Sequence, residues 1–262
     1  MRRCTGCVFA ILAFIWSGAA AIRAEDPVVP VYHEPHHRQV FQYETTRILD
    51  VQIPPGDTSW YHTHESPILY VTLSNSQNRI QNLGQDWNLP GGGRGANPNA
   101  NAPAATTNPA RNANSNAAGG APPAARVSST TSYVEQPVTH RLQNVGDRLF
   151  RLVAVINEAK GDDLTTQEAA GFAGKAELTN RWFRAYRFTV APGESTSPHR
   201  HQTPVVIVQA TDGRARGVGA MKFDFTEAGR WAFFDAGDAH EIRNTGTAPV
   251  DFVEVEVRRP AQ

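Results

Sequence analysis

The fold of this chain is decided by the stretch PGDTSWYHTH at residues 55–64, which recurs 137 positions later as PGESTSPHRH at residues 192–201. Each copy begins with a Pro-Gly pair and ends with two histidines that flank a single residue. A third histidine follows each copy, because residues 140–146 read HRLQNVG and residues 240–246 read HEIRNTG. A duplicated three-histidine pattern with the same spacing is hard to obtain by chance, so two related halves are expected.

The segments around these motifs have the composition of β-strands. They are short, rich in β-branched and aromatic residues, and bounded by Gly, Pro, Asn and Asp. The expected strands are residues 47–53, 68–73 and 149–156 in the first half and residues 184–190, 205–209 and 251–257 in the second. We interpret Asn144–Asp147 and Asn244–Thr247 as hairpin turns. The pattern predicts an all-β chain of two tandem β-barrels or jelly rolls.

The start of the chain has the pattern of an export signal. Arg2 and Arg3 precede an apolar run, Val8–Trp16, that is too short to span a bilayer, and small residues follow up to Ala24. We expect cleavage of residues 1–24, with an uncleaved membrane anchor as the alternative. Both cysteines lie in this signal, so the mature protein is expected to be cysteine-free, periplasmic or secreted, and without a stable membrane span.

The remaining chain divides into two predicted domains, residues 25–158 and residues 181–262. Residues 159–180 form the predicted connection, in which only Leu164–Leu178 favours a helix. From about residue 84 to residue 126 the first domain contains an insertion that is rich in Asn, Pro, Ala and Gly. Such a segment buries too little apolar surface to offset its loss of backbone entropy, so we expect it to be disordered.

The charge balance bears on possible partners. The chain has 25 Lys and Arg residues and 25 Asp and Glu residues. Proteins that bind nucleic acid or anionic membranes usually have an excess of basic residues. We therefore expect a small-molecule ligand or substrate and no nucleic-acid partner.

The histidine spacing indicates a candidate metal site in each half. Residues i and i+2 of a strand point to the same face, so His62 and His64 share one face, as do His199 and His201. Thr63 and Arg200 then point away. A third histidine from a facing strand can complete a site that leaves coordination positions open. The candidate metal ligands are therefore His62, His64 and His140 in the first half and His199, His201 and His240 in the second.

These motifs resemble those of the cupin superfamily in its two-domain, or bicupin, form. The first cupin motif, a glycine followed after five residues by His-x-His, is matched at Gly56 and again at Gly193. The second motif is matched at Gly237, His240 and Asn244, whereas the first half matches it only at His140 and Asn144. The resemblance covers roughly residues 38–158 and 181–258. It implies two small barrels of the RmlC-like jelly-roll type, each with a metal ion inside.

The sequence departs from the cupin pattern at the glutamate that normally follows His-x-His. Its position would fall at Ile68 or Leu69 in the first half and at Val205 or Val206 in the second. We therefore expect three neutral imidazoles and no carboxylate at each site. A divalent ion would keep its full positive charge there and favour an anionic or chelating substrate.

Several functional interpretations follow from the resemblance. The leading one is an exported metal-dependent enzyme, most plausibly of dioxygenase type, that uses Fe, Mn, Ni, Cu or Zn. The alternative is a non-catalytic barrel that binds a sugar or another small molecule, with metal incidental. A third interpretation is that one half is active and the other only stabilises the pair, and the second half is then the expected active one, because it keeps the fuller motif and has no insertion. Barrels of this family often pair, so a homodimer is one of the expected states.

Five other residues near these motifs are interpreted as structural. Asn144 and Asn244 are expected to be turn residues, since each lies four residues past its histidine. An extra ligand could come from His33, His36 and His37, near the mature N-terminus, but we favour a solvated terminal segment.

Overall fold

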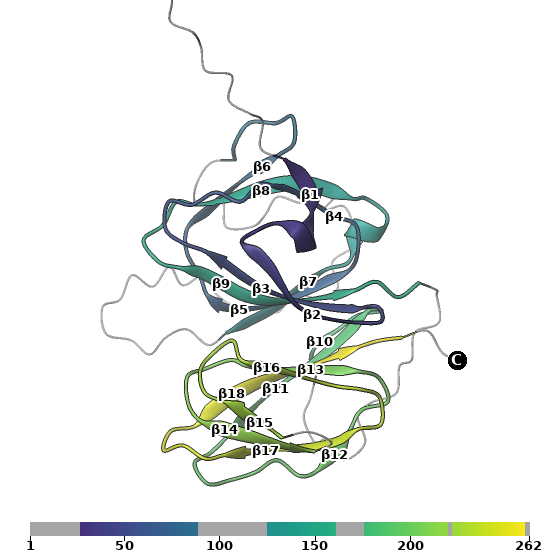
Figure 1. Ribbon diagram of the computed structural model, residues 1–262, viewed down its shortest axis with the longest axis vertical. Coiled ribbons are helices and arrows are strands. Elements are labelled where there is room, and N and C mark those ends of the chain that lie inside the picture. The colour runs from purple at the N-terminus through teal and green to yellow at the C-terminus, as the bar shows by residue number, and fades with distance from the viewer. Residues whose placement is uncertain (1–26, 89–124, 161–175, 220–221, 260–262) are drawn as a thin grey trace, which may run out of the picture.

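The computed structural model describes residues 27–88, 125–160, 176–219 and 222–259 (Figure 1). The predicted export signal lies outside the described residues, as do residues 89–124 of the predicted insertion and residues 161–175 of the predicted connection. Helices within the described ranges are single 3-10 turns, η1 (Val31–His33) and η2 (Ser132–Val134). None of them could cross a membrane.

The described part of the first half consists of two facing sheets. The five-stranded sheet has the order β2 (His37–Tyr43), β3 (Thr46–Ile53), β9 (Phe150–Asn157), β5 (Ile68–Ser74) and β7 (Arg126–Thr130). The four-stranded sheet has the order β1 (Val28–Pro30), β4 (Tyr61–His64), β8 (Val138–Asn144) and β6 (Asn78–Asn82). Strand β1 is parallel to β4, and the other neighbours are antiparallel.

The second half repeats this arrangement. Its five-stranded sheet has the order β10 (Ala176–Thr179), β11 (Phe183–Val190), β18 (Val250–Val257), β13 (Val205–Gln209) and β16 (Trp231–Phe234). Its four-stranded sheet has the order β12 (His199–Arg200), β17 (Ala239–Asn244), β14 (Ala215–Gly219) and β15 (Phe223–Phe225). The all-β fold of two jelly-roll barrels predicted from the repeat is confirmed, and the six predicted strands form β3, β5, β9, β11, β13 and β18.

Alternation along the strands explains why each barrel has an interior. In β3, Leu49, Val51 and Ile53 point into the first barrel, whereas Ile48 points to the opposite face. Side chains of a strand alternate between faces, so a strand with apolar residues at both parities must be covered on both sides. This requirement is met because the five-stranded sheets of the two barrels pack against each other.

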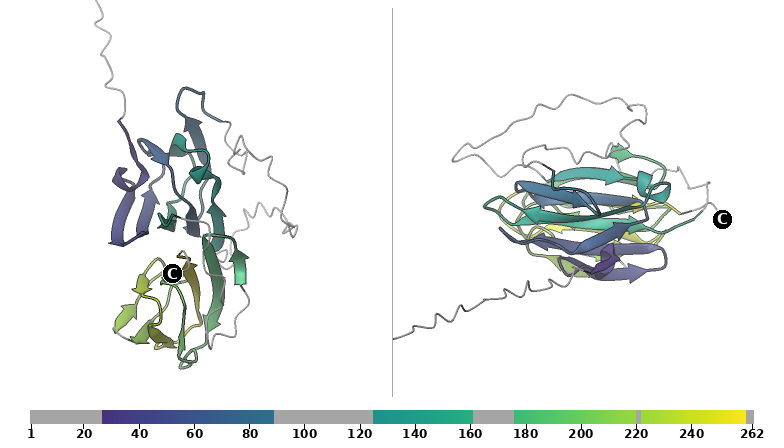
Figure 2. Two further views of the ribbon diagram at one scale, coloured as in Figure 1. Left: turned by 90° about the vertical axis from the view of Figure 1, so that its right-hand side faces the viewer. Right: turned by 90° about the horizontal axis from the view of Figure 1, so that it is seen from above.

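The contact between the barrels is a shared apolar core. From the first half it includes Ile48, Leu69 and Val155, and from the second it includes Phe183 and Val255, all of which are fully buried. Figures 1 and 2 show the two barrels stacked, with the five-stranded sheets facing each other in the middle. Burial of a large apolar side chain stabilises a fold by about 1.5–3 kcal/mol. The two barrels are therefore expected to unfold together.

The repeated Pro-Gly pairs form tight turns just after the ends of β3 and β11. Gly56 has a φ of 85° and Gly193 a φ of 77°, in the left-handed region that glycine adopts without steric cost. The backbone N–H of Gly56 donates to the carbonyl of Asn144 at 2.9 Å. The N–H of Gly193 donates to the carbonyl of Asn244 at 3.2 Å. The turn is therefore fixed to the strand that bears the third histidine.

The prediction of hairpins after Asn144 and Asn244 is wrong. Strands β8 and β9 belong to different sheets, and so do β17 and β18, so each turn crosses from one sheet to the other. The side-chain amide of Asn144 donates to the carbonyls of Ile53 at 2.8 Å and Arg148 at 2.7 Å. As predicted, these asparagines are turn residues, and their amides join the two sheets.

Replacement of Asn244 by alanine is expected to destabilise the protein. The Asn244 side chain is fully buried and donates to the carbonyls of Val190 and Ala248, each at 2.8 Å. Its loss leaves both carbonyls without this donor, so the free energy of unfolding should fall by about 3 kcal/mol. Urea unfolding followed by circular dichroism measures this change. Thr245→Ala, at an exposed position of the same turn, is the control, and equal effects of the two variants would contradict the assigned role.

The predicted helix over 164–178 is wrong at its end, because Ala176–Thr179 forms β10 and pairs with β11.

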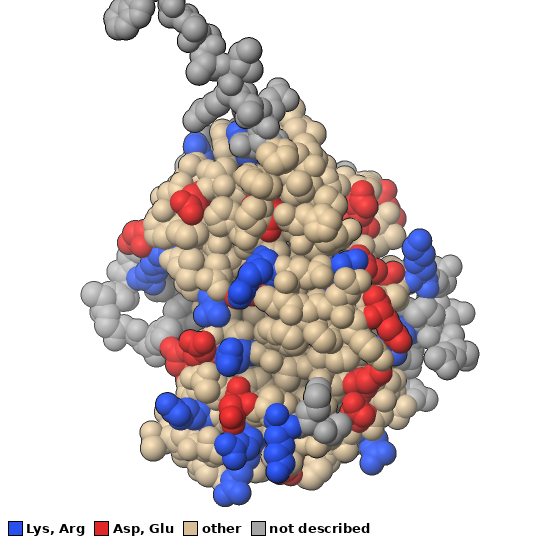
Figure 3. Space-filling model, viewed as in Figure 1, with Lys and Arg blue, Asp and Glu red and all other residues tan. Residues whose placement is uncertain are grey.

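On the face drawn in Figure 3, basic and acidic residues are interspersed and form no continuous patch of one sign. This distribution is in keeping with the balanced formal charge of the chain.

Candidate metal centres

Strand pairing brings the six candidate histidines together in two groups of three. His62 of β4 lies directly opposite His140 of β8, and His199 of β12 lies directly opposite His240 of β17. His64 and His201 lie two residues further along, on the same face. Within each group the potential ligand atoms all lie within 4.8 Å of one another. We name these groups the first centre (His62, His64, His140) and the second centre (His199, His201, His240).

The first centre is a compact cluster of imidazoles. The ring of His62 lies 5.1 Å from the ring of His64 and 4.8 Å from that of His140, measured between centroids. His62 is 0% exposed and His64 is 4% exposed. Tyr133 stacks on His64 at 4.7 Å. Thr63 points away, as predicted, and its hydroxyl bonds to that of Thr139 at 2.8 Å.

Hydrogen bonding prepares His62 to act as a ligand. Its Nδ1 lies 2.9 Å from the carbonyl oxygen of Trp60, so Nδ1 carries the hydrogen and Nε2 keeps its lone pair. This Nε2 is buried and has no hydrogen-bond partner among the described residues. A buried polar atom without a partner is costly, which fits a role as metal ligand.

The first centre holds its histidines in the neutral form that binds metal. Burial lowers the pKa of His62 and His64 well below the usual value, and the positive charge that neighbouring histidines would carry adds to the effect. Burial and the neighbouring His37 also lower the pKa of His140 to about 4. Neutral imidazole is the form that coordinates a metal ion, so no proton has to be displaced at neutral pH.

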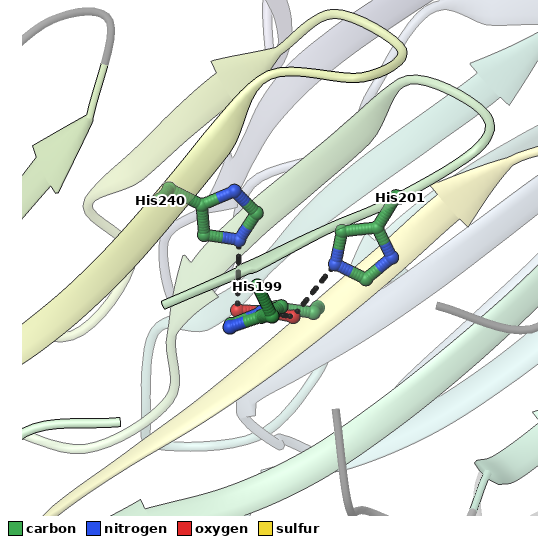
Figure 4. Close-up of side chains that lie close together, drawn as sticks. His199, His201 and His240 are labelled. Atoms are coloured by element: carbon green, nitrogen blue, oxygen red, sulfur yellow. Dashed lines mark hydrogen bonds and ion pairs between the residues drawn. The ribbon is translucent and has the colours of Figure 1, made fainter. Parts of the chain in front are cut away.

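The second centre differs because it contains a carboxylate. Glu254 of β18 is 0% exposed, and its Oε2 lies 3.0 Å from Nε2 of His199 and 3.1 Å from Nε2 of His201. Its Oε1 lies 3.4 Å from Nε2 of His240. Figure 4 shows the three labelled rings turned toward one point, with dashed lines marking contacts among the side chains drawn. Three histidines and one glutamate thus form a set of four buried potential ligands.

The expectation of no carboxylate at either centre is wrong for the second. The cupin pattern would place the glutamate on β13. Here it comes instead from β18, the strand next to β13. Glu254 lies directly opposite Ile207 of β13 and points to the same interior. In the first barrel the equivalent position of β9 is Ala154, and among the described residues no carboxylate belongs to the group of His62, His64 and His140.

A buried chain of hydrogen bonds between charged side chains extends from the second centre. Nδ1 of His201 lies 2.9 Å from Glu256, and the guanidinium of Arg184 lies 3.4 Å from the other oxygen of that carboxylate. Burial lowers the pKa of His201, but hydrogen bonds with Glu254 and Glu256 outweigh this effect and raise it to about 9. Burial raises the pKa of Glu254, but hydrogen bonds with His199, His201 and His240 outweigh this effect and hold it well below its usual value.

The two centres also have different surroundings. At the second centre, Phe234 stacks on His240 at 4.4 Å, and Phe225 and Phe252 pack in the same barrel interior. At the first centre, His64 lines a pocket of about 190 Å³. Tyr32 and Ile156 also line this pocket. Of the three histidines of the first centre, only His64 lines this pocket.

The segment before the first barrel is more ordered than predicted. Glu34 is 2% exposed and its carboxylate accepts hydrogen bonds from Nδ1 of both His36 and His37. The ring of His37 lies 4.3 Å from that of His62. The interpretation of a solvated terminal segment is therefore wrong for these residues. The sequence signal that could have revealed the contact is the presence of three histidines and a glutamate within five positions, 33–37.

Comparison with known proteins supports the fold. The chain matches no family model and no curated protein. Its structure is similar to that of AerE from Microcystis aeruginosa, with a TM-score of 0.54 and 11% sequence identity over 83% of this chain and 90% of AerE. At this identity the similarity concerns the fold alone, because one fold serves many functions.

Two other solved structures match with TM-scores below 0.5. A cupin 2 conserved barrel domain protein from Leptotrichia buccalis matches at 0.44, with 10% identity over 84% of this chain and 86% of that chain. Oxalate decarboxylase from Bacillus subtilis, in its structure at pH 4.6, matches at 0.45, with 12% identity over 82% of this chain and 68% of that chain. The resemblance to cupins therefore depends on the two sequence motifs and on the histidine clusters inside the barrels.

Proposed function

We propose that the protein is an exported two-barrel cupin that binds a divalent transition metal ion at each centre and acts as an enzyme on a small organic substrate. The observation that carries this proposal is the convergence of His199, His201, His240 and Glu254, four buried ligands within 4.8 Å of one another. Imidazole suits Fe, Ni, Cu and Zn, and carboxylate suits Mn, so the ligands do not select among these metals. A bound ion would supply Lewis acidity and a template for a chelating substrate, as in an enzyme of oxygenase type.

The pocket in the first barrel supports a small substrate. Its volume of about 190 Å³ is below the range of about 300–1,000 Å³ that is typical of pockets for drug-sized ligands. The pocket reaches His64, and the first centre has no carboxylate among its three histidines. Three neutral imidazoles leave the ion its full charge, which favours an anionic or chelating substrate. The pocket thus favours the first barrel as the active one, whereas the fuller sequence motif favours the second.

A second candidate function is binding without catalysis. The observation that favours it is the ion-pair network of the second centre, in which Glu254 contacts all three histidines. Such a network could stabilise a barrel that binds a sugar or another small molecule. This candidate predicts saturable ligand binding that persists when the metal ions are removed.

The metal content of variants tests the proposed function. We expect up to two metal ions per chain, with one lost in His62→Ala/His64→Ala and the other lost in His199→Ala/His201→Ala, because each pair removes two ligands of one centre. Elemental analysis of protein purified without a metal-binding tag measures the content. The melting temperature of each variant is the control for folding, since His199→Ala/His201→Ala leaves Glu254 with fewer partners.

Turnover assays with the same variants separate the two candidate functions. Diketones, catechols, flavonols and sugar acids are tested with and without oxygen. Activity that is lost in the variant of one centre and kept in the other identifies the catalytic barrel. Metal binding without turnover of any of these compounds would favour the non-catalytic function, and absence of metal in reconstituted wild-type protein would contradict the proposal.

A further inference from the structure

We propose that His37 is a fourth ligand of the first centre, supplied by the segment that precedes the barrel and held in position by Glu34. The proposal rests on the proposed binding of metal by this protein. It concerns a residue outside both histidine motifs, and it gives the first centre the fourth ligand that Glu254 supplies in the second.

The segment that bears His37 is fixed to the first barrel. Strand β1 pairs with β4, the strand that bears His62 and His64, and places Val29 beside His62. Val31 is 4% exposed and packs in the interior of the barrel. Strand β2 then begins at His37, opposite Val51 of β3. The His37 backbone therefore has a defined position at the start of β2, on the edge of the five-stranded sheet.

Glu34 holds this segment in place, because its two carboxylate oxygens accept four hydrogen bonds. Its side chain is 0% exposed. Oε1 accepts hydrogen bonds from the backbone N–H of Trp60 at 3.1 Å and from Nδ1 of His36 at 3.2 Å. Oε2 accepts hydrogen bonds from the backbone N–H of His36 at 2.9 Å and from Nδ1 of His37. A buried carboxylate is costly unless it is paired in this way, so these contacts hold the segment in one conformation.

The hydrogen bond to Glu34 directs His37 toward metal binding. A carboxylate accepts and Nδ1 donates, so the lone pair of His37 lies on Nε2. This is the arrangement found when a carboxylate orients a histidine that binds metal through its other nitrogen. His62 has the same tautomer through the carbonyl of Trp60. The two histidines therefore each offer an Nε2 atom.

The ring of His37 lies beside the ring of His62. Its centroid lies 4.3 Å from that of His62, and its side chain is 11% exposed. Ligand atoms of Glu34, His37 and His62 lie within 4.8 Å of one another. The oxygens of Glu34 already accept hydrogen bonds, so His37 is the residue of this segment that can still bind a metal ion. His62, whose buried Nε2 has no partner among the described residues, belongs to both groups. His37 therefore adjoins the first centre through His62, although the ligand atoms of His37, His62, His64 and His140 do not all lie within 4.8 Å of one another.

Stepwise titration of the full-length, metal-free chain with Co(II), followed by absorption spectroscopy, tests the proposal. In His37→Ala we expect the binding phase of one centre to weaken by about 100-fold or more, because a direct ligand is lost, and its spectrum to change, with the other phase unchanged. In Glu34→Gln, which keeps the shape of the side chain, we expect the same phase to weaken by about 10-fold. His33→Ala, an exposed histidine of the same segment, is the matched control and should change neither phase.

The outcomes distinguish this proposal from the proposed function. Unchanged affinity and an unchanged spectrum in His37→Ala would overturn the role of His37, while metal binding itself would stand. No Co(II) binding by the wild-type chain would overturn the proposed function. If the melting temperature shows that His37→Ala does not fold, His37→Gln replaces it, because its amide can still donate to Glu34. Wild-type Co(II) affinity and spectrum in that folded variant would equally overturn the assignment.

Discussion

Replacement of Glu254 by glutamine is expected to remove the metal ion from the second centre and to leave the first centre loaded. Glu254 is the one carboxylate in the group of four ligands, and it contacts His199, His201 and His240. Loss of residues that only orient a ligand typically weakens metal binding by about 10- to 100-fold, so loss of a direct ligand should reach about 100-fold or more. Elemental analysis and titration of the metal-free chain measure the content and the affinity.

The same substitution is expected to destabilise the metal-free protein. A buried ion pair that loses one partner leaves an uncompensated charge, and the free energy of unfolding should fall by about 3 kcal/mol. Glu241→Gln is the matched control, because Glu241 lies next to His240 in sequence but on the other face of β17. Retention of two metal ions with wild-type affinity in Glu254→Gln would show that the carboxylate is not a ligand.

The position of Glu254 also explains why the sequence did not reveal it. In residues 250–257 the glutamates 254 and 256 alternate with valines, as on a strand with one face in the core and one in solvent. That pattern assigns the valines to the core and the glutamates to solvent. In the structure the valines face the other barrel and the glutamates face their own barrel, so both are buried. Closure of the second barrel makes the acidic face an interior, and packing against the first barrel buries the valines.

The histidine motifs were more predictable because they depend on local geometry. The separation of two residues in His-x-His fixes a shared face in any strand, and the third histidine follows from the repeat. All six histidines lie where these rules place them. The turns after Asn144 and Asn244 were predictable as turns, but not as crossings between sheets, because strand partners are set by tertiary packing. Contacts of Glu34 and His37 were missed for the same reason.

The metal-free protein is expected to lose stability on the alkaline side of pH 6.5 through the second centre. Burial lowers the pKa of His199 and His201, but their contacts with Glu254 outweigh it and raise both, that of His201 to about 9. A raised histidine pKa stabilises the folded state fully below the unfolded value of 6.5, and this stability is lost as the pH rises toward 9. For His201, which is 1% exposed, the difference corresponds to roughly 3 kcal/mol.

The first centre is expected to act in the opposite direction. Burial lowers the pKa of His62 and His64, and that of His140 to about 4, so the unfolded chain takes up protons first as the pH falls below 6.5. The lowered pKa of Glu254 adds stability above 4.5 that is lost as the pH falls through its folded value. The alkaline loss of stability therefore comes from His199 and His201, and the acidic loss comes from the first centre and Glu254. Together the two losses place the stability maximum of the metal-free protein near pH 6.5.

Urea unfolding of chelator-treated protein at pH values below, at and above 6.5 measures this profile. In Glu254→Gln the alkaline loss should become smaller, because the main partner that raises the pKa of His199 and His201 is gone. The acidic loss caused by the first centre should remain, and His62→Ala/His64→Ala should reduce it. Stability of the wild-type, metal-free chain that rises steadily from pH 6.5 to 9 would contradict the ion-pair network of the second centre.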